Sequence, residues 1–537
     1  DTKSAADTVQ SEVSKVMCIL IPVVIIILVL TTDSYFSPIL FMIVIGTSIF
    51  LNMGSNVIFK HVSFLTYSIV AALQLAVSMD YSVFMLHEFE SHKGEDLEKA
   101  MMETVKKSCL SIFSSALTTI AGFLALCFMG FTIGADMGLV FAKGIVLTLF
   151  TVILFMPCLI LKFYPLIEKT HHKSFMPDFE KFAKYTAKIS YLLIAIVLII
   201  TIPSYVAQKQ NIFLYGSSSF GGGEGTKVYE DEKKINSKFD RSNPMIVLVP
   251  TGDYVSEKAL VKEIEDMESV KKVQSLANLV SEGIPDSFVP IDKYQKFRTD
   301  KYSRLVIYTK TSSESDLAFE TSRKIEELTK KYYGDNYEIT GTVPITLNIK
   351  DVVNADYTRV NIFSILAVMV ILLFTFKSFI LPILLTLVIE SGIFINMAIP
   401  YYTGKEMMFL GYLIVSTIEL GATIDYAILM TNNYLNARKE NDKKTASRIA
   451  VNKSIQSILT SGGILVCAAF LLKWCSSIKA VSEMGGLIGR GALISMFLVI
   501  FFLPHILSLF DKAIEETKFR SVKKSKTKEK VTEEVVK

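Results

Sequence analysis

Long apolar runs separated by short polar segments are the most regular feature of the chain. About eleven such runs occur in the 537 residues, and each is long enough, or nearly so, for a helix to cross about 30 Å of hydrocarbon. Membrane β-strands would instead show about 10 residues of alternating polarity. We therefore predict an α-helical polytopic membrane protein. The predicted spans are residues 16–30, 38–58, 64–86, 108–129, 137–163, 189–207, 360–376, 380–400, 407–431, 454–472 and 485–510.

One long polar segment, residues 208–358, interrupts the series and has the pattern of a folded α+β domain. Its elements follow the order strand, helix, strand, strand, helix, strand, which is typical of the ferredoxin-like split βαβ fold. The glycine-rich stretch 216–225 lacks the spacing of a phosphate-binding loop and is predicted to be a flexible entry loop. The predicted strands are 244–249, 270–276, 302–308 and 337–340, and the predicted helices are 256–268 and 315–333.

The membrane segments occur twice. Asp80-Tyr81 and Asp425-Tyr426 lie in matching apolar contexts, roughly 345 residues apart. A repeat of this size predicts two pseudo-symmetric helical bundles, related as in transporters with parallel repeats. Further pairs at nearly the same offset are Asn52 with Asn396, Ser111 with Ser454, Leu117 with Leu459, Lys143 with Arg490, and Pro157 with Pro504.

Composition and charge agree with a membrane location and fix an orientation. Hydrophobic residues make up 51% of the chain and the mean hydropathy is +0.43, which excludes an ordinary soluble domain of this size. The net charge is only +4, but Lys and Arg cluster in 162–188, 438–453 and 518–530. The positive-inside rule places these loops and the C-terminus in the cytoplasm. A basic tail near anionic lipid explains the last cluster, and we expect no nucleic-acid partner.

These observations give a domain organisation. The residues before the first span resemble the end of segment 208–358, so we expect a first span and a first outer domain to be missing from the chain. The expected parts are 1–15, the end of that outer domain; 16–165, the first membrane half without its first helix; 166–188, a cytoplasmic linker; 189–207, the helix that opens the second half; 208–358, an extracytoplasmic domain; 359–512, the rest of the second half; and 513–537, a basic cytoplasmic tail.

Enzymatic and metal-binding chemistry have no motif in the sequence. The six cysteines form no CxxC pair, and no His joins them at metal-ligand spacing. The acidic and His-containing segment 87–107 is interpreted as a cytoplasmic amphipathic helix with a solvated face. No Walker loop or Ser-His-Asp arrangement occurs, so we expect no enzyme, no cofactor and no use of ATP.

The repeated Asp-Tyr pair is the candidate functional site. A carboxylate at the bilayer centre costs about 2.5–3.5 kcal/mol on insertion scales, and intramembrane carboxylates are functional by default. We expect Asp80 and Asp425 to face each other across the interface of the halves and to titrate as a unit. Tyr81 and Tyr426 can each bind the carboxylate of the opposite half. The predicted role is a proton relay, and the alternative is a static polar clamp between helices.

Several other polar residues could support such a relay. Hydroxyl residues in the next span of each half can donate hydrogen bonds or hold water, although such residues at helix interfaces usually serve packing and mutual hydrogen bonding. Lys143 and Arg490 could partner the carboxylates, but snorkelling or local pairing beside Asp136 and Glu483 is favoured. Glu419 stands opposite Gln74, and Glu390 opposite Gly46, so either could tune the relay, line a substrate path or simply be buried against a polar neighbour. The hydroxyl residues are Ser114, Ser115, Thr118, Thr119, Ser457, Thr460 and Ser461.

Together, the twin bundles, the outer domain and the Asp-Tyr pair in each half resemble the resistance-nodulation-division (RND) superfamily, and within it the MMPL branch. The resemblance covers almost the whole chain. It implies twelve spans in the complete protein and proton-driven export of lipidic, hydrophobic or amphiphilic molecules across the cytoplasmic membrane. It also implies contact with membrane lipids and assembly as trimers in many members, or as monomers in some.

Two further functions remain open at this stage. A proton-driven accessory of protein secretion belongs to the same superfamily, but its characteristic Asp-Gly motifs are not seen around Asp80 or Asp425. A lipid-sensing scaffold that does not transport is the second alternative. The carboxylate is intact in both halves, which argues against this scaffold.

Overall fold

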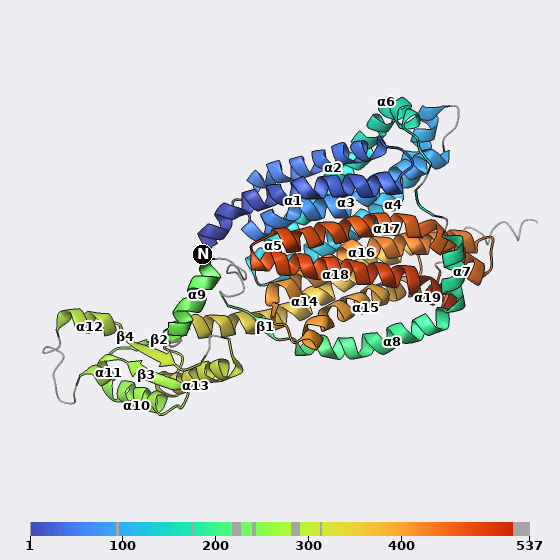
Figure 1. Ribbon diagram of the computed structural model, residues 1–537. Coiled ribbons are helices and arrows are strands. Elements are labelled where there is room, and N and C mark those ends of the chain that lie inside the picture. Colours follow the sequence, from blue (N-terminus) through green and yellow to red (C-terminus); the bar gives the residue numbers. More distant parts are fainter. Residues whose placement is uncertain are drawn as a thin grey trace, which may run out of the picture. The chain divides into compact units, whose positions relative to one another are not determined.

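The computed structural model describes residues 2–92, 96–173, 175–177, 179–216, 227–238, 243–280, 290–311 and 314–518 (Figure 1). The expected basic tail beyond Lys518 and nearly all of the expected entry loop 216–225 lie outside the described residues. The chain divides into two compact units. One consists mainly of residues 213–356, inside the expected range 208–358, and the other holds the apolar helices.

Eleven helical segments within the described ranges are long and apolar enough to cross a membrane, which agrees with the predicted count. Four of the apolar runs belong to helices that begin well before the predicted span, because polar residues precede the apolar stretch in the first, fourth, seventh and tenth of them. The helices that lie wholly or partly in the unit of apolar helices, the membrane unit, are α1 (Thr2–Thr31), α2 (Ser37–Gly54), α3 (Phe64–His92), α4 (Leu97–Ala125), α5 (Thr132–Phe150), α6 (Met156–Lys169), α7 (Glu180–Lys188), α8 (Ser190–Ala207), α14 (Thr342–Phe376), α15 (Ile380–Thr403), α16 (Phe409–Arg438), α17 (Lys443–Cys475), α18 (Lys479–Phe501), α19 (Leu503–Leu509) and α20 (Asp511–Glu516).

The two halves meet through four helices that contact one another crosswise. In Figure 1 the long helices of this unit run side by side, and α3 packs on both α4 and α17, while α16 packs on both α17 and α4. The spans in α3 and α16 are 89% and 94% buried, the highest values among the described spans. A polar side chain on either helix therefore lies inside the protein rather than against lipid.

Prolines interrupt the last span of both halves at matching positions. Pro157 lies in the first turn of α6, directly after a π-helical turn at Thr151–Phe155, and Pro504 lies in the first turn of α19 after a break at Phe502. Proline has no backbone N–H and clashes with the preceding turn, so it begins a new helical segment instead of continuing the old one. The predicted runs 137–163 and 485–510 are therefore each two consecutive helices.

A close crossing of α4 and α16 depends on two glycines. A Cβ atom added at Gly122 would lie 2.9 Å from the Cα atom of Gly421, which is closer than such atoms approach in proteins. Small residues at this point let the two backbones approach, as is common between membrane helices. Thr119 Oγ1 then donates to the carbonyl oxygen of Gly421 at 3.0 Å. This crossing positions α4 beside the turn of α16 that carries Asp425.

The second unit contains a four-stranded antiparallel sheet in the order β3-β4-β2-β5, with the helices α10 and α13 in the chain between its strands. Val247 pairs with Leu305 on one side and with Ile339 on the other. The inward-facing side chains of the sheet pack with those of α10 and α13 in one apolar core. The elements are α9 (Lys227–Lys238), β2 (Asn243–Pro250), α10 (Tyr254–Glu265), β3 (Val270–Gln274), α11 (Leu276–Leu279), α12 (Ile291–Phe297), β4 (Tyr302–Thr309), α13 (Asp316–Tyr333) and β5 (Glu338–Gly341); two short strands, β1 (Phe213–Leu214) and β6 (Met407–Met408), lie elsewhere in the chain.

Candidate functional site

Asp80 on α3 and Asp425 on α16 line one cavity inside the membrane unit. The cavity has a volume of about 580 Å³ and lies among α3, α4, α16 and α17. Both carboxyl groups keep partial access to it, although the helices that carry them are otherwise almost entirely buried. Asp80 and Asp425 also interact electrostatically with each other. The structure therefore brings the two predicted carboxylates together in a single polar site.

Among the described residues, the lining of the cavity reaches solvent on one side of the Asp pair. From Asp80 and Asp425 it follows α3 and α16 toward their C-terminal ends, where His87, Asn436 and Lys453 are exposed at its mouth. In the opposite direction every residue of α16 from Phe409 to Ile424 is buried. Water thus has a route to the carboxyl groups from one end of the bundle, while side chains pack the other route closed.

Each carboxylate meets hydroxyl groups from the opposite half. Thr118 Oγ1 lies 3.5 Å from Asp425 Oδ1, and Thr119 Oγ1 lies 3.4 Å from Asp425 Oδ2. On the other side, Ser461 lies beside Asp80. The sequence suggested that these hydroxyl residues could support the site, but the repeat alone did not show that each set serves the other half's carboxylate.

The two tyrosines are buried next to the same pair of carboxylates. Tyr81 and Tyr426 are only 2% and 3% exposed. Tyr81 lies beside Asp425, and Tyr426 interacts electrostatically with Asp80, so each tyrosine faces the opposite half. The hydroxyl oxygen of Tyr81 has no hydrogen-bond partner among the described residues. A phenol in this position is free to donate to a carboxylate that loses its proton.

The remaining hydroxyl residues divide into two groups. Ser115, Ser457 and Thr460 line the cavity, where they can hold water next to the carboxyl groups. Thr460 Oγ1 also donates to the backbone oxygen of Gln456 at 2.8 Å. Ser114 is half-buried and does not belong to the cavity wall.

Lys143 and Arg490 bind asparagines rather than the carboxylates. Lys143 Nζ donates to the backbone oxygen of Asn52 and to Asn56 Oδ1, at 3.0 and 2.6 Å. Arg490 Nε donates to Asn396 Oδ1 at 2.7 Å. Asp136, the expected neighbour of Lys143, instead accepts hydrogen bonds from the Ser63 backbone N–H and from Thr66 Oγ1. Lys143 and Arg490 are thus paired locally, but with asparagines and not with Asp136 and Glu483 as expected.

These asparagines belong to a second polar network in each half, away from the cavity. In the first half, Asn52 donates to Gln74 Oε1 at 2.8 Å, and Gln74 donates to the backbone oxygen of Gly144 at 3.1 Å. In the second half, Asn396 donates to Glu419 Oε2 at 2.9 Å, and Ser495 donates to Glu419 Oε1 at 3.2 Å. The asparagine is thus the same in both halves, whereas its partner is the amide of Gln74 in the first half and the carboxyl group of Glu419 in the second.

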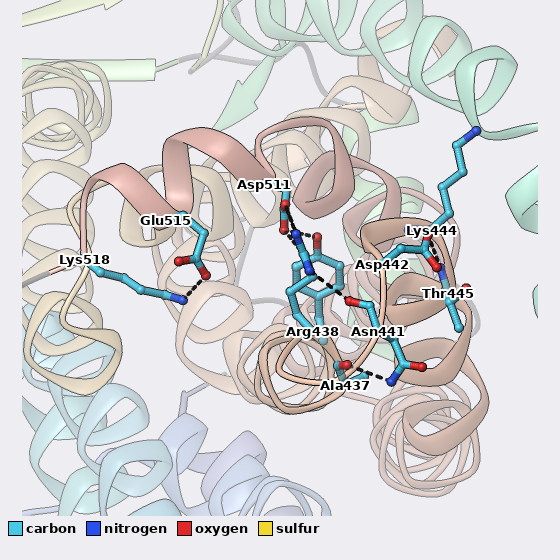
Figure 2. Close-up of polar contacts among 10 residues, drawn as sticks. Ala437, Arg438, Asn441, Asp442, Lys444, Thr445, Asp511, Glu515 and Lys518 are labelled. Carbon is cyan, nitrogen blue, oxygen red and sulfur yellow. Dashed lines mark hydrogen bonds and ion pairs between the residues drawn. The ribbon is translucent and has the colours of Figure 1, made fainter.

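The end of α16 is fixed by an ion pair that the sequence did not single out (Figure 2). Arg438 Nε and Nη2 donate to the two carboxylate oxygens of Asp511 at 3.0 and 3.1 Å, and Tyr434 Oη donates to Asp511 Oδ1 at 2.7 Å. Burial alone would raise the pKa of Asp511, but these hydrogen bonds outweigh it and hold the pKa below its ordinary value. The pair anchors the helix that carries Asp425 to α20.

Sequence reasoning missed the polar residues between the Asp pair and the cavity mouth. Asn432, Asn433 and Asn436 line the cavity on α16, and Gln456 and Lys453 line it on α17. The available signal was the spacing of the three asparagines, which puts them on one side of an otherwise apolar helix. Their match to a cavity could not be seen without knowing which helices surround them.

Comparison with known proteins identifies the family. The model of the MMPL family matches residues 2–163 and 222–529, which is most of the chain. The chain belongs to the MMPL family. It is therefore a multi-pass membrane protein of the MMPL branch of the RND superfamily, as the repeated Asp-Tyr pair and the twin bundles predicted.

A relative of this MMPL protein is known from Methanocaldococcus jannaschii, under the name "Putative membrane protein MJ1562". The two are 30% identical over 104 residues, which cover 19% of this chain and 26% of the relative. The chain thus spans about a quarter of the length of that relative. This match supports a membrane protein and carries no information on what is transported.

Proposed function

We propose that this MMPL protein exports hydrophobic or amphiphilic molecules, such as lipids, across the cytoplasmic membrane at the expense of the proton gradient. The observation that carries the proposal is the shared cavity, in which Asp80 and Asp425 from two repeated helices lie with two tyrosines and hydroxyl groups from the opposite halves. A static clamp would need no water-accessible cavity. Intramembrane carboxyl groups with access to water are suited to carrying protons.

The cavity mouth is proposed to face the cytoplasm. The mouth lies beside the junction of α16 and α17, which carries Arg438, Lys439, Lys443 and Lys444. Lys and Arg in short loops favour the cytoplasmic side. In this orientation the protein is in a state that releases protons inward, and the packed layer from Phe409 to Ile424 separates the site from the outside.

The hydroxyl groups around Asp425 suit a carboxyl group that changes its charge. A hydroxyl has one proton to donate, so Thr119 Oγ1 donates either to the Gly421 carbonyl or to Asp425, not to both. When Asp425 is protonated, it can itself donate to a threonine oxygen. When it is ionised, Thr118, Thr119 and Tyr81 can turn toward it. Each proton that crosses the membrane supplies about 2.3 kcal/mol per 100 mV to the movement of the halves.

The unit formed mainly by residues 213–356 is proposed to be an extracytoplasmic ferredoxin-like domain that opens and closes the path of the substrate. The strand order β3-β4-β2-β5 with two intervening helices supports this assignment. The oligomeric state and the class of transported molecule are proposed on the family resemblance alone. A secretion accessory or a lipid-sensing scaffold has no specific observation in its favour.

The test uses the full-length protein in proteoliposomes with a headgroup-labelled fluorescent phosphatidylethanolamine as the probe and an imposed proton gradient. Asp425→Asn is expected to abolish gradient-dependent movement of the probe, because an amide does not exchange a proton. Asp442→Asn is the matched control, since Asp442 caps α17 through the Lys444 and Thr445 amides and does not line the cavity. Unchanged transport by Asp425→Asn at equal protein density would overturn the proposal.

A further inference from the structure

Two carboxyl groups in the second half, those of Glu390 and Glu419, do not line the cavity that holds the Asp pair. Glu390, near the middle of α15, is 7% exposed, and Glu419 on α16 is 2% exposed. Neither carboxylate oxygen of Glu390 has a hydrogen-bond partner among the described residues. An ionised carboxylate buried in this way would be very unfavourable, which favours the neutral, protonated form of Glu390.

The first half shows what the same scaffold looks like without titratable groups. Gln74 occupies the place of Glu419, and Gly46 occupies the place of Glu390. The amide of Gln74 satisfies the network by accepting from Asn52 and donating to Gly144. A purely structural role therefore needs only an amide at one position and no side chain at the other. The two carboxyl groups of the second half add a property that packing does not require.

Glu390 and Glu419 have unequal surroundings. Asn396 and Ser495 each donate to Glu419, and Arg490 binds the same Asn396 and interacts electrostatically with Glu419. Glu390 receives none of these hydrogen bonds, and its carboxyl group interacts repulsively with that of Glu419. When one proton is shared between them, it therefore resides on Glu390, while Glu419 carries the charge that its donors stabilise.

The position of Glu419 sets this pair apart from the cavity. Glu419 precedes Asp425 by six residues, which is about 9 Å along a helix axis. It lies on the side of Asp425 that is packed closed, opposite to the cavity mouth. The two carboxyl pairs thus occupy successive levels of the same helix bundle.

Other titratable groups around Glu390 are mostly tyrosines. Tyr412 on α16 and Tyr357 on α14 interact electrostatically with Glu390, and their rings stack at a centroid distance of 4.3 Å. The remaining helices around α15 contribute Tyr205 on α8, Arg490 on α18, His505 on α19, and Asp511 on α20, which is paired with Arg438. Within the described residues, Glu419 is thus the carboxylate that couples to Glu390.

We propose that Glu390 and Glu419 form a second proton-binding site, present only in the second half and located on the closed side of the Asp80–Asp425 pair. The ligand is a proton rather than a metal cation, because Asn396 directs an N–H group and Ser495 directs a hydroxyl proton at Glu419. The site gives the second half an additional proton that the first half cannot carry. Its contribution to transport rests on the proposed function, but its protonation does not.

The experiment measures protonation directly in the full-length, reconstituted protein. Infrared difference spectroscopy on a pH step detects the C=O stretch of a buried protonated carboxyl group, and a pH indicator counts the protons bound per chain. Glu390→Gln is expected to remove one carboxyl band and a single bound proton, and Glu390→Asp is expected to restore both. Glu419→Gln reproduces the amide of the first half and should leave the Glu390 band in place, because the carboxyl group that gives rise to the band is unchanged.

Controls separate this site from the relay and from misfolding. Glu406→Gln changes an exposed carboxyl group in the loop before α16 and should alter neither the carboxyl band nor the number of bound protons. The Glu390 band should persist in the combined variant Asp80→Asn and Asp425→Asn. An unchanged band and proton count in a folded Glu390→Gln protein would overturn the second site. A different result would be that Glu390→Gln loses the band while the combined Asp80→Asn and Asp425→Asn variant still transports with the proton gradient. That result would refute the proposed function and leave the second proton-binding site standing.

Discussion

At the scale of single residues, the site depends on hydrogen bonds that can change with protonation. Thr119 lies at the centre of this behaviour because its hydroxyl is within reach of both the Gly421 carbonyl and Asp425 Oδ2. A hydrogen bond to a charged group contributes about 1.5–3 kcal/mol, and more when it is desolvated. Loss of one such donor should therefore make the ionised form of Asp425 harder to reach without preventing folding.

Thr119→Val tests this role, since valine keeps the shape of threonine and lacks the hydroxyl. We expect gradient-driven transport to slow by about tenfold, the factor that corresponds to about 1.4 kcal/mol. Thr119→Ser keeps the hydroxyl and should retain most of the rate. Equal rates for the valine and serine variants in proteoliposomes would show that the hydroxyl has no part in proton movement.

The residues of the Asp-Tyr site and their pairing across the halves were predictable from the sequence, but the partners of the supporting residues were not. The repeat identified Asp80, Tyr81, Asp425 and Tyr426 because identical pairs in matching apolar contexts stand out without any structure. It could not reveal that Arg490 binds Asn396, since that contact joins residues 94 positions apart. The favoured position beside Asp136 and Glu483 relied on sequence proximity, whereas packing of α15 against α18 decides the contact.

At the scale of helices, the spans were predictable and their crossing points were not. Apolar runs locate α2 to α5 and α14 to α18 because lipid demands about 20 apolar residues in each. The repeated prolines mark where α6 and α19 begin, although each last span was predicted from the sequence as one continuous run. The crossing of Gly122 with Gly421 had no signal, because isolated glycines are frequent in membrane helices and only one pair meets at this point.

Gly122→Val is expected to separate α4 from α16 and to move Thr119 away from Asp425. Overpacking of this kind costs about 1–3 kcal/mol. Gly463→Ala on α17 is the control, because a Cβ atom there meets nothing within 4 Å. Thermal unfolding of the purified protein should show a lower midpoint for Gly122→Val alone. A midpoint equal to that of the control would mean that the helices tolerate the extra volume.

The Arg438–Asp511 pair predicts a pH dependence of stability. The folded-state pKa of Asp511 lies below the ordinary value of about 3.9, so the pair stabilises the fold at neutral pH and loses its effect as the pH falls through that lower value. Asp511→Asn should cost about 1.5–3 kcal/mol at neutral pH and progressively less below about pH 4. Unfolding midpoints of both proteins across this range measure the difference, and a gap that stays constant with pH would contradict the assignment.

At the scale of the whole molecule, the two halves share a scaffold but not a chemistry. Asn52 and Asn396 hold equivalent networks, yet the first is closed by Gln74 and the second by Glu419. The membership in the MMPL family was predictable because the repeat and the soluble segment together are distinctive. The cavity was not, since its wall combines residues from four helices of both halves.

The central claim is that Asp80 and Asp425 act as one composite site, and variants of each half test it most directly. Gradient-driven transport by the full-length protein should be compared for Asp80→Asn, Asp425→Asn and the combined variant at equal protein density. Residues that act as a unit are not additive, so each single variant should lose as much transport as the combined variant. Two single variants that each retain substantial transport, with further loss only in the combination, would contradict the account.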